Sequence, residues 1–367
     1  MTETRPRLLI STWHSVFRSD GTIARVKKVI SVLEEHYDVH TITMANRSEI
    51  PPSLDKLKIH VVSPSPPRTF AKVFIWLPKI ASYLAGTKFD VIICENDWHG
   101  FLAHYLMSRI RGHRILFDAH GMISRDSASS GDELLARWLN RRLERFCISN
   151  SDYVIVVSEE ILEAYAKYNR RIECIPVFQK CPEIVAGRIH DKGSQERERK
   201  IGVIGPFDSK RNRQALEYVQ RSIDDFSSSI RFVVIGDCGE RIDHPRISYT
   251  GYIESDQKYL ETVSSLDAVL VLEKISTSGP LTKILEPMSR GIPVYTTPLG
   301  TIGLRHLESG KNIMISDEGG LADLINRTIF DDDQIERLRR ESYSYVKEFY
   351  GYENASKKMG TILKTLI

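Results

Sequence analysis

Hydrophobic and polar residues alternate along the chain as short strands and longer helices. Residues 22–35 predict a helix, because apolar side chains recur there at helical spacing: Ile23, Val26, Ile30 and Leu33. Arg25, Lys27 and Lys28 fall on the other faces and are expected to contact water. Short runs rich in β-branched residues predict six strands in the first half, at residues 8–12, 38–43, 58–62, 91–94, 115–118 and 153–158. This alternation is typical of parallel sheets built from strand–helix–strand units.

The alternation restarts in the second half. After a strand at 172–177, residues 180–200 are polar and contain few large apolar side chains, so we interpret them as an interdomain linker. Five more strands are predicted at residues 201–204, 232–235, 247–250, 268–272 and 294–296. The pattern predicts two α/β domains with parallel sheets, residues 1–185 and 186–352, with a ligand cleft between the two sheet edges.

The last residues, 353–367, form one more predicted helix. Its apolar side chains share a face: Ala355, Met359, Ile362, Leu363 and Leu366. A terminal helix of this kind is stable only when it docks on a folded surface. We expect it to cross back onto the first domain.

Composition fits this picture and excludes several classes of protein. The chain has 367 residues, of which 41% are hydrophobic and 27% charged, more than one hydrophobic core usually organises. Disordered, collagen-like and disulfide-stapled chains are excluded. The longest apolar runs are strand-sized, so no membrane-spanning helix is expected, and the polar start lacks the pattern of a secretory signal. We therefore expect a cytoplasmic protein.

Cysteine spacing and net charge limit the partners. The five cysteines are odd in number and contain no Cys-x-x-Cys pair, so we expect reduced, mostly buried thiols and no zinc site. The net charge of +3 is too small to argue for nucleic acid. It suits a polyphosphate ligand or an anionic membrane surface equally well.

Polar side chains gather just after the predicted strands of the first half. Glu95, Asp97 and His99 follow one strand, and His120 follows another that ends with Asp118. Because ligands bind at the carboxyl ends of parallel strands, the first three are candidates for binding acceptor hydroxyls. Equally, they can cap a helix that starts near residue 98. His120 is either a structural hydrogen-bonding group or part of the active site.

In the second half, the segment 278–291 (SGPLTKILEPMSRG) is the most informative. Gly279 and the following proline predict a helix over residues 281–290, whose first amides, from Leu281 and Thr282, would form an anion site. Lys283 and Glu286 stand one turn apart. A cation there would neutralise a diphosphate and a carboxylate could bind a ribose diol, whereas the alternative is an ordinary surface ion pair.

Several segments of the second half follow one another in a characteristic order: 205–216 (GPFDSKRNRQAL), 233–240 (VVIGDCGE), 248–253 (SYTGYI), 264–274 (SSLDAVLVLEK) and 279–304. Residues 19–35, 115–121, 150–160 and 174–178 of the first half fit the same order more loosely. With these segments, nearly the whole chain resembles glycosyltransferase family 4. The resemblance implies the GT-B fold, two Rossmann-like, doubly wound parallel-sheet domains that face a central cleft. It also implies a retaining, metal-independent hexosyl transfer from a nucleotide-diphosphate sugar, with UDP, GDP or ADP as the nucleotide, to a hydroxyl acceptor.

The resemblance also implies roles for individual residues. Glu286 corresponds to the glutamate that holds the donor ribose, and Lys283 to the basic residue of the donor-binding helix. Gly205 begins the loop in which Lys210 or Arg211 would hold the diphosphate. Gly21 corresponds to the glycine turn that approaches the phosphates, and His120 to the histidine beside the transferred sugar. No metal ligand and no cofactor is implied.

Three positions differ from the family pattern. The usual first glutamate, seven residues before Glu286, is Gly279, so backbone amides are expected to contact the sugar there. Pro206 stands where an arginine often follows the phosphate-loop glycine, and Asp20–Gly21 replaces a Gly-Gly pair. Placing Gly21 and His120 on one domain and Lys283 and Glu286 on the other predicts domain closure on donor binding.

Two rival functions stay open at this point. A nucleotide-sugar epimerase of the same fold would need no acceptor, and a catalytically silent protein would bind nucleotide sugar without turnover. A nicotinamide dehydrogenase is disfavoured because no Gly-x-Gly-x-x-Gly follows a strand.

Two other segments have a simple structural interpretation. The acidic run 331–333 precedes a helix, so a helix cap is favoured over an Asp-x-Asp metal motif. Residues 68–88 place apolar side chains on one face near basic ones: Phe70, Phe74, Leu77, Ile80 and Leu84. We favour a core helix there over a peripheral contact with the inner face of the membrane.

Overall fold

The computed structural model of the chain describes residues 5–17, 21–50, 58–65, 69–124, 134–183, 198–207, 210–239, 241–274 and 280–367. The chain divides into two compact units, Met1–Phe178 together with Ala355–Ile367, and Gln179–Asn354. The predicted domain limits lie a few residues from these bounds.

The first unit is built on a seven-stranded parallel sheet with the strand order β3-β2-β1-β4-β5-β6-β7. Its strands are β1 (Arg7–Thr12), β2 (Asp38–Met44), β3 (Ile59–Val62), β4 (Val91–Glu95), β5 (Arg114–Ala119), β6 (Tyr153–Val156) and β7 (Ile172–Cys174). All seven predicted strands of this half are confirmed. The central strands are buried on both faces, which explains why they read as continuous apolar runs.

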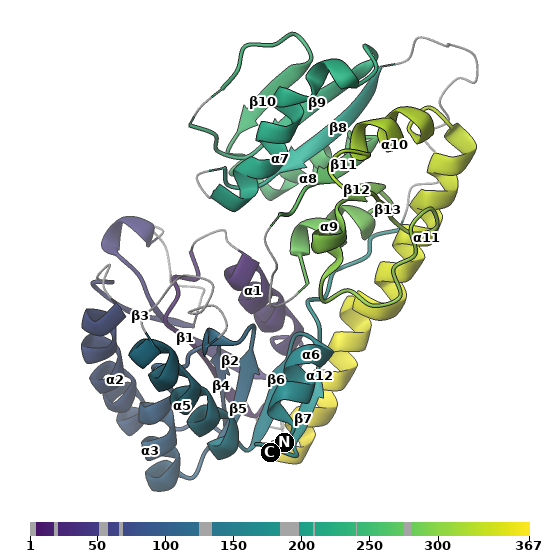
Figure 1. The fold of residues 1–367 in the computed structure, drawn as a ribbon. Coiled ribbons are helices and arrows are strands. Elements are labelled where there is room, and N and C mark those ends of the chain that lie inside the picture. The colour runs from purple at the N-terminus through teal and green to yellow at the C-terminus, as the bar shows by residue number, and fades with distance from the viewer. Residues whose placement is uncertain are drawn as a thin grey trace. The chain divides into compact units, whose positions relative to one another are not determined.

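Helices cover this sheet (Figure 1). They are α1 (Gly21–Leu33), α2 (Thr69–Gly86), α3 (Phe101–Arg111), α5 (Leu134–Asn150) and α6 (Glu159–Tyr165), with a short 3-10 turn, η1 (Arg47–Glu49). Side chains of α2, α3, α5 and α6 join one hydrophobic cluster with strand residues such as Phe117. These four helices therefore form one layer.

Helix α2 is the core helix that we favoured for residues 68–88, and Ile80 and Leu84 of the predicted face are buried. Phe74 of that face is instead 65% exposed, and Trp76, which the prediction left out, is buried. Trp76 faces the core because its indole Nε1 donates a hydrogen bond to the buried Asp97, 2.8 Å away. The side chain of Phe70 lies outside the described residues.

The second unit has a six-stranded parallel sheet with the order β10-β9-β8-β11-β12-β13. Its strands are β8 (Arg199–Ile204), β9 (Ile230–Ile235), β10 (Ile247–Gly251), β11 (Ala268–Val271), β12 (Val294–Thr296) and β13 (Met314–Ile315). Its helices are α7 (Lys210–Arg221), η2 (Ile223–Asp225), α8 (Asp256–Ser264), α9 (Thr282–Met288), η3 (Pro298–Thr301), α10 (Leu321–Thr328) and α11 (Asp332–Tyr350). Two parallel-sheet α/β units confirm the predicted fold class.

The predicted linker, residues 180–200, reaches too far into this unit. Residues 184–197 lie outside the described residues, but Arg199 and Lys200 belong to β8. Arg199 is buried, because its guanidinium forms ion pairs with Asp267 and Asp332. A charged residue therefore begins this strand.

The terminal helix α12 (Tyr352–Leu366) buries the predicted face, Ala355, Met359, Ile362, Leu363 and Leu366. Lys358 Nζ donates a hydrogen bond to the Cys174 carbonyl oxygen, 3.2 Å away, at the end of β7. Residues from Ala355 onward thus pack with the first unit.

All five cysteines are free, and four of them are buried. Among the helices that the structure describes, none combines the length and the apolar character that crossing a bilayer requires.

Candidate active site

A buried network of charges lies at the carboxyl ends of β4 and β5. Glu95 ends β4 and pairs in register with Asp118 of β5. Both oxygens of Asp118 accept hydrogen bonds from Arg25 of α1, from Nε at 3.0 Å and from Nη2 at 3.1 Å. The expectation that Arg25 contacts water is wrong: it is 2% exposed, because its guanidinium neutralises Asp118 and donates to the Pro176 carbonyl oxygen.

His120 is held against both carboxylates. Its Nε2 lies 2.9 Å from Glu95 Oε2 and 3.8 Å from Asp118 Oδ2. Burial lowers the pKa of His120, but the hydrogen bonds and negative charges of Asp118 and Glu95 outweigh burial and raise that pKa above its usual value. For Glu95, burial and the nearby Asp118 charge raise the pKa. His120 and Glu95 therefore form a close, desolvated pair in which the neighbouring carboxylates favour the protonated imidazole.

Glu95, Asp118 and His120 also have the spacing of a metal site, since one potential ligand atom of each lies within 4.8 Å of the others. However, Arg25 occupies both Asp118 oxygens, and its positive charge opposes a second cation. Within the part of the chain that the structure describes, Glu95 Oε1 and His120 Nδ1 have no hydrogen-bond partner. The donor set is thus better suited to a hydrogen-bonding ligand than to a metal ion.

Asp97 and His99, the other candidates after β4, differ in what they contact. Asp97 is fully buried and accepts hydrogen bonds from Trp76, from Ser11 Oγ at 3.1 Å and from the Gly100 amide at 2.8 Å. His99 is half-buried and stacks on Trp13 with a ring separation of 4.3 Å, and burial lowers its pKa. Asp97 therefore orders the turn before α3, which begins at Phe101 and not near residue 98.

In the second unit, α9 carries two of the predicted donor-binding residues. Its N-cap is Leu281 and its first residue is Thr282, as expected, but it ends at Met288, before the predicted residue 290. Lys283 Nζ forms an ion pair with the buried Glu273 and lies 3.3 Å from Asn212 Oδ1.

Glu286, one turn further along α9, accepts a hydrogen bond at Oε2 from the Tyr259 hydroxyl, 3.3 Å away. Burial, followed by the Glu286 charge, raises the pKa of Tyr259. Lys283 and Glu286 therefore have different partners, and Tyr259 fixes one oxygen of the Glu286 carboxylate.

The loop after β8 requires glycine at a close backbone contact. A Cβ on Gly236 would lie 2.1 Å from the Gly205 carbonyl oxygen, and Gly236 has a φ of 129°. The Gly205 amide donates to the Ile235 carbonyl oxygen at 3.1 Å. The backbones of the loops that follow β8 and β9 thus touch at Gly205 and Gly236.

Several predicted site residues have no described side-chain surroundings. Lys210 begins α7, but its side chain and that of Arg211 lie outside the described residues, as does the whole of Gly279. Gly21 is the first residue of α1. Their predicted roles stay predictions.

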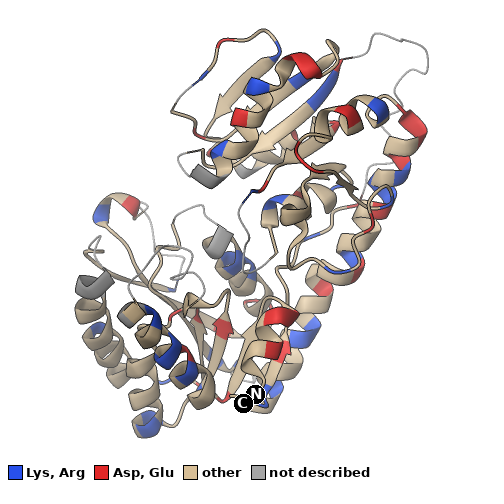
Figure 2. Ribbon diagram, in the orientation of Figure 1, with Lys and Arg blue, Asp and Glu red and all other residues tan. Residues whose placement is uncertain are grey.

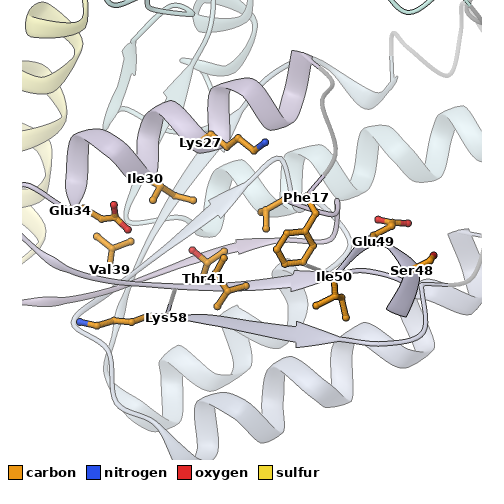
Figure 3. Close-up of a pocket in the computed structure, with 12 residues that line it drawn as sticks. Phe17, Lys27, Ile30, Glu34, Val39, Thr41, Ser48, Glu49, Ile50 and Lys58 are labelled. Carbon is orange, nitrogen blue, oxygen red and sulfur yellow. The ribbon is translucent and has the colours of Figure 1, made fainter. Parts of the chain in front are cut away.

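A cavity of about 660 Å³ lies beside α1, β2 and β3 in the first unit. Figure 3 shows Lys27 and Glu34 of α1 and Lys58 around apolar side chains such as Phe17. None of the predicted site residues lines it.

Sequence reasoning missed three residues of these networks. Arg25 was assigned to the wet face of its helix, and the helical pattern contains no signal of its ion pair. Glu273 directly follows the predicted strand 268–272, a position that signals a site, but no role was predicted for it. Tyr259 had no signal in the sequence.

Comparison with solved structures defines the class of protein. The chain is similar to sucrose-phosphate synthase from Thermosynechococcus elongatus, with 17% identity, a TM-score of 0.75 and 99% of both chains covered. It is also similar to Anabaena HepE in complex with UDP-glucose, with 13% identity and a TM-score of 0.70; the match covers 98% of this chain and 99% of HepE. For the lipopolysaccharide outer core galactosyltransferase WaaB the identity is 13%, the TM-score 0.68 and the coverage 99% and 100%. These likenesses confirm the GT-B fold.

The family follows from the sequence of the first unit. Residues 20–178 match the model of Glycosyltransferase Family 4. Residues 20–178 are thus a Glycosyltransferase Family 4 region, and the chain is a glycosyltransferase with the GT-B fold. The matched region lies in the first half of the chain, where the sequence motifs resemble the family pattern more loosely. No curated protein sequence matches the chain.

Proposed function

We propose that the protein is a retaining glycosyltransferase that moves a sugar from a nucleotide-diphosphate sugar to a hydroxyl acceptor without a metal ion. The observation that carries this proposal is the His120 network, a histidine at a strand end whose pKa two carboxylates raise. A protonated imidazole in a desolvated setting stabilises negative charge that develops on a departing diphosphate. Anabaena HepE, a structural neighbour, is solved with UDP and with UDP-glucose, which makes UDP the first nucleotide to test.

In the second unit, we assign the donor ribose to Glu286. The Tyr259 hydroxyl donates a hydrogen bond to Glu286 Oε2. This bond fixes the plane of the carboxylate and so orients Oε1 toward hydrogen bonds from the ribose hydroxyls. The diphosphate would lie at the Leu281 and Thr282 amides and near Lys210 or Arg211 of the loop that Gly205 begins. Backbone amides at Gly279 would contact the sugar. Lys283, held in place by its ion pair with Glu273, would supply positive charge that neutralises the diphosphate.

A transfer that retains the anomeric configuration of the sugar needs no nucleophile from the enzyme. The bond between the anomeric carbon and the diphosphate oxygen breaks, and the acceptor oxygen forms its new bond on the same face of the sugar. The departing diphosphate takes the acceptor proton. His120 orients the sugar and stabilises charge in this step, so it is not an obligate base.

Among the three acceptor candidates, Glu95 and His99 suit hydrogen bonds to acceptor hydroxyls best. In the described part of the chain, Glu95 Oε1 and His99 Nδ1 have no hydrogen-bond partner, whereas Asp97 is fully buried and already accepts three hydrogen bonds. Asp97 then acts as a positioning residue for the turn that carries His99.

The proposal is tested by donor turnover in the presence of EDTA. UDP-, GDP- and ADP-glucose are each incubated with a panel of soluble sugar acceptors, and nucleoside diphosphate release and product anomer are followed by chromatography and NMR. We expect release with a retained anomer, reduced ~10²-fold by His120→Ala. An inverted anomer, or activity that only Mg²⁺ or Mn²⁺ restores, would contradict the mechanism. Sugar conversion without acceptor would indicate an epimerase instead.

A further inference from the structure

The outward face of α3 is apolar. Leu102, Leu106 and Ile110 are 44%, 53% and 74% exposed and follow one another at spacings of four residues. The opposite face buries Phe101 and Met107 in the core of the unit. A helix on the surface of a soluble domain normally presents polar residues to water, so this row needs a partner surface.

The neighbouring helix α5 adds to this surface. Leu134, Trp138 and Leu139 are 81%, 52% and 51% exposed. The two helices touch, because the Phe146 ring of α5 lies 5.8 Å from Phe101 and 5.4 Å from Tyr105 of α3. We call the six exposed apolar residues, Leu102, Leu106, Ile110, Leu134, Trp138 and Leu139, the outer patch.

Three helices of this layer, α2, α3 and α5, are predominantly basic, whereas the fourth, α6, carries Glu159, Glu160 and Glu163. The basic residues on the three helices are Lys79, Arg109, Arg111, Arg137, Arg141, Arg142 and Arg145, against the single acid Glu144. Glu144 is buried and accepts two hydrogen bonds from Ser124, so it does not offset the basic surface. Figure 2 shows the run of basic residues along α5. The Arg142 guanidinium lies 4.7 Å from the Trp138 ring centre, so charge and apolar surface are directly adjacent.

We propose that the outer patch docks on an anionic membrane surface. Apolar side chains enter the interfacial region, while the surrounding guanidiniums attract lipid phosphates. A second copy of the chain is disfavoured as the occupant, since self-association would bring together the arginines of two copies. The patch lies on α3 and α5 and not on residues 68–88, where we favoured a core helix over a membrane contact and where Trp76, Ile80 and Leu84 are core residues.

Vesicle flotation tests the proposal without any glycosyl donor, so its outcome is independent of the proposed function. The full chain is mixed with vesicles of phosphatidylcholine alone, or of phosphatidylcholine with phosphatidylglycerol. We expect at least ~10-fold stronger binding to the anionic vesicles, and a loss of that binding in the double variant Leu106→Glu, Ile110→Glu. Both side chains are exposed, so the fold tolerates the change, which an unchanged Tm confirms.

Matched controls separate the patch from general charge effects. Ile242→Glu changes a 47% exposed residue in the second unit, and Arg337→Glu an exposed arginine of α11, for comparison with Arg142→Glu in the patch. The two controls should keep vesicle binding, and Arg142→Glu should weaken it several-fold. Equal loss in patch and control variants would overturn the proposal, as would equal binding to both vesicle types.

Trp138 provides a second readout. Trp76 and Trp98 are buried and Trp13 is half-buried, so Trp138 is the most exposed indole of the chain. Anionic vesicles should shift the emission to the blue and brominated lipids should quench it, and Trp138→Phe should remove both signals. A concentration-dependent dimer that Leu106→Glu, Ile110→Glu dissolves, with no vesicle binding, would overturn the proposal in favour of a second copy.

Discussion

At the scale of single residues, His120 is the group whose setting matters most for chemistry. Its imidazole sits beside Glu95 and Asp118, and Arg25 holds Asp118 ionised: burial would raise the pKa of this carboxyl, but the Arg25 charge lowers it. The position of His120 could be predicted, because residues after parallel strands meet at one sheet edge. The ion pair with Arg25 could not, since helical spacing says nothing about which strand a polar side chain faces.

The Glu95→Gln variant tests this setting. Removing the Glu95 charge should lower the pKa of His120, which NMR titration of its ring follows directly. In the wild type, a raised pKa means that the folded state binds the proton more tightly. The stability due to His120 is therefore complete below its unfolded pKa of about 6.5 and is lost as pH rises through its folded pKa.

Chemical denaturation from about pH 6 to about pH 9 should show that loss in the wild type and less of it in Glu95→Gln. Glu163→Gln, which removes a charge from an exposed position on α6, is the control and should leave the His120 titration unchanged. A wild-type His120 that titrates below about 6.5 would contradict the account.

At the scale of elements, apolar periodicity was sufficient for the twelve predicted strands and for α1 and α12. It missed β13, which has only two residues, Met314 and Ile315, too few to show a period. On α2 it placed Ile80 and Leu84 in the core correctly, but it included the exposed Phe74 and left out Trp76, whose contact with Asp97 is a tertiary effect. The acidic run caps α11 as predicted, with Asp331 Oδ1 accepting from the Gln334 amide at 2.9 Å.

Helix α12 makes a stability prediction at this scale. Leu363 is fully buried, so Leu363→Ala should lower the free energy of unfolding by about 2–5 kcal/mol through lost burial and a cavity. Lys364→Ala, at the exposed neighbouring position, should change it by less than about 0.5 kcal/mol. Denaturant titration measures both. Equal effects of the two substitutions would show that α12 does not dock through this face.

At the scale of the whole molecule, the sequence predicted two parallel-sheet units and a glycosyltransferase of the GT-B fold. Both follow from the order of elements and from motifs that are local in sequence, which explains why they could be predicted. The partners of Lys283 and Glu286 depend on side chains from other elements, Glu273, Asn212 and Tyr259, and spacing along one helix cannot supply them.

The proposed function depends above all on binding of a nucleotide-diphosphate sugar through α9 without a metal ion. Calorimetric titration with UDP, GDP and ADP in EDTA tests it most directly, using the wild type, Glu286→Ala and the exposed control Glu341→Ala. We expect one nucleotide to bind the wild type and the control alike. Glu286→Ala should bind it about 10- to 150-fold more weakly, because charged hydrogen bonds to the ribose are worth about 1.5–3 kcal/mol. Undiminished binding by Glu286→Ala, or binding that requires Mg²⁺, would contradict the claim.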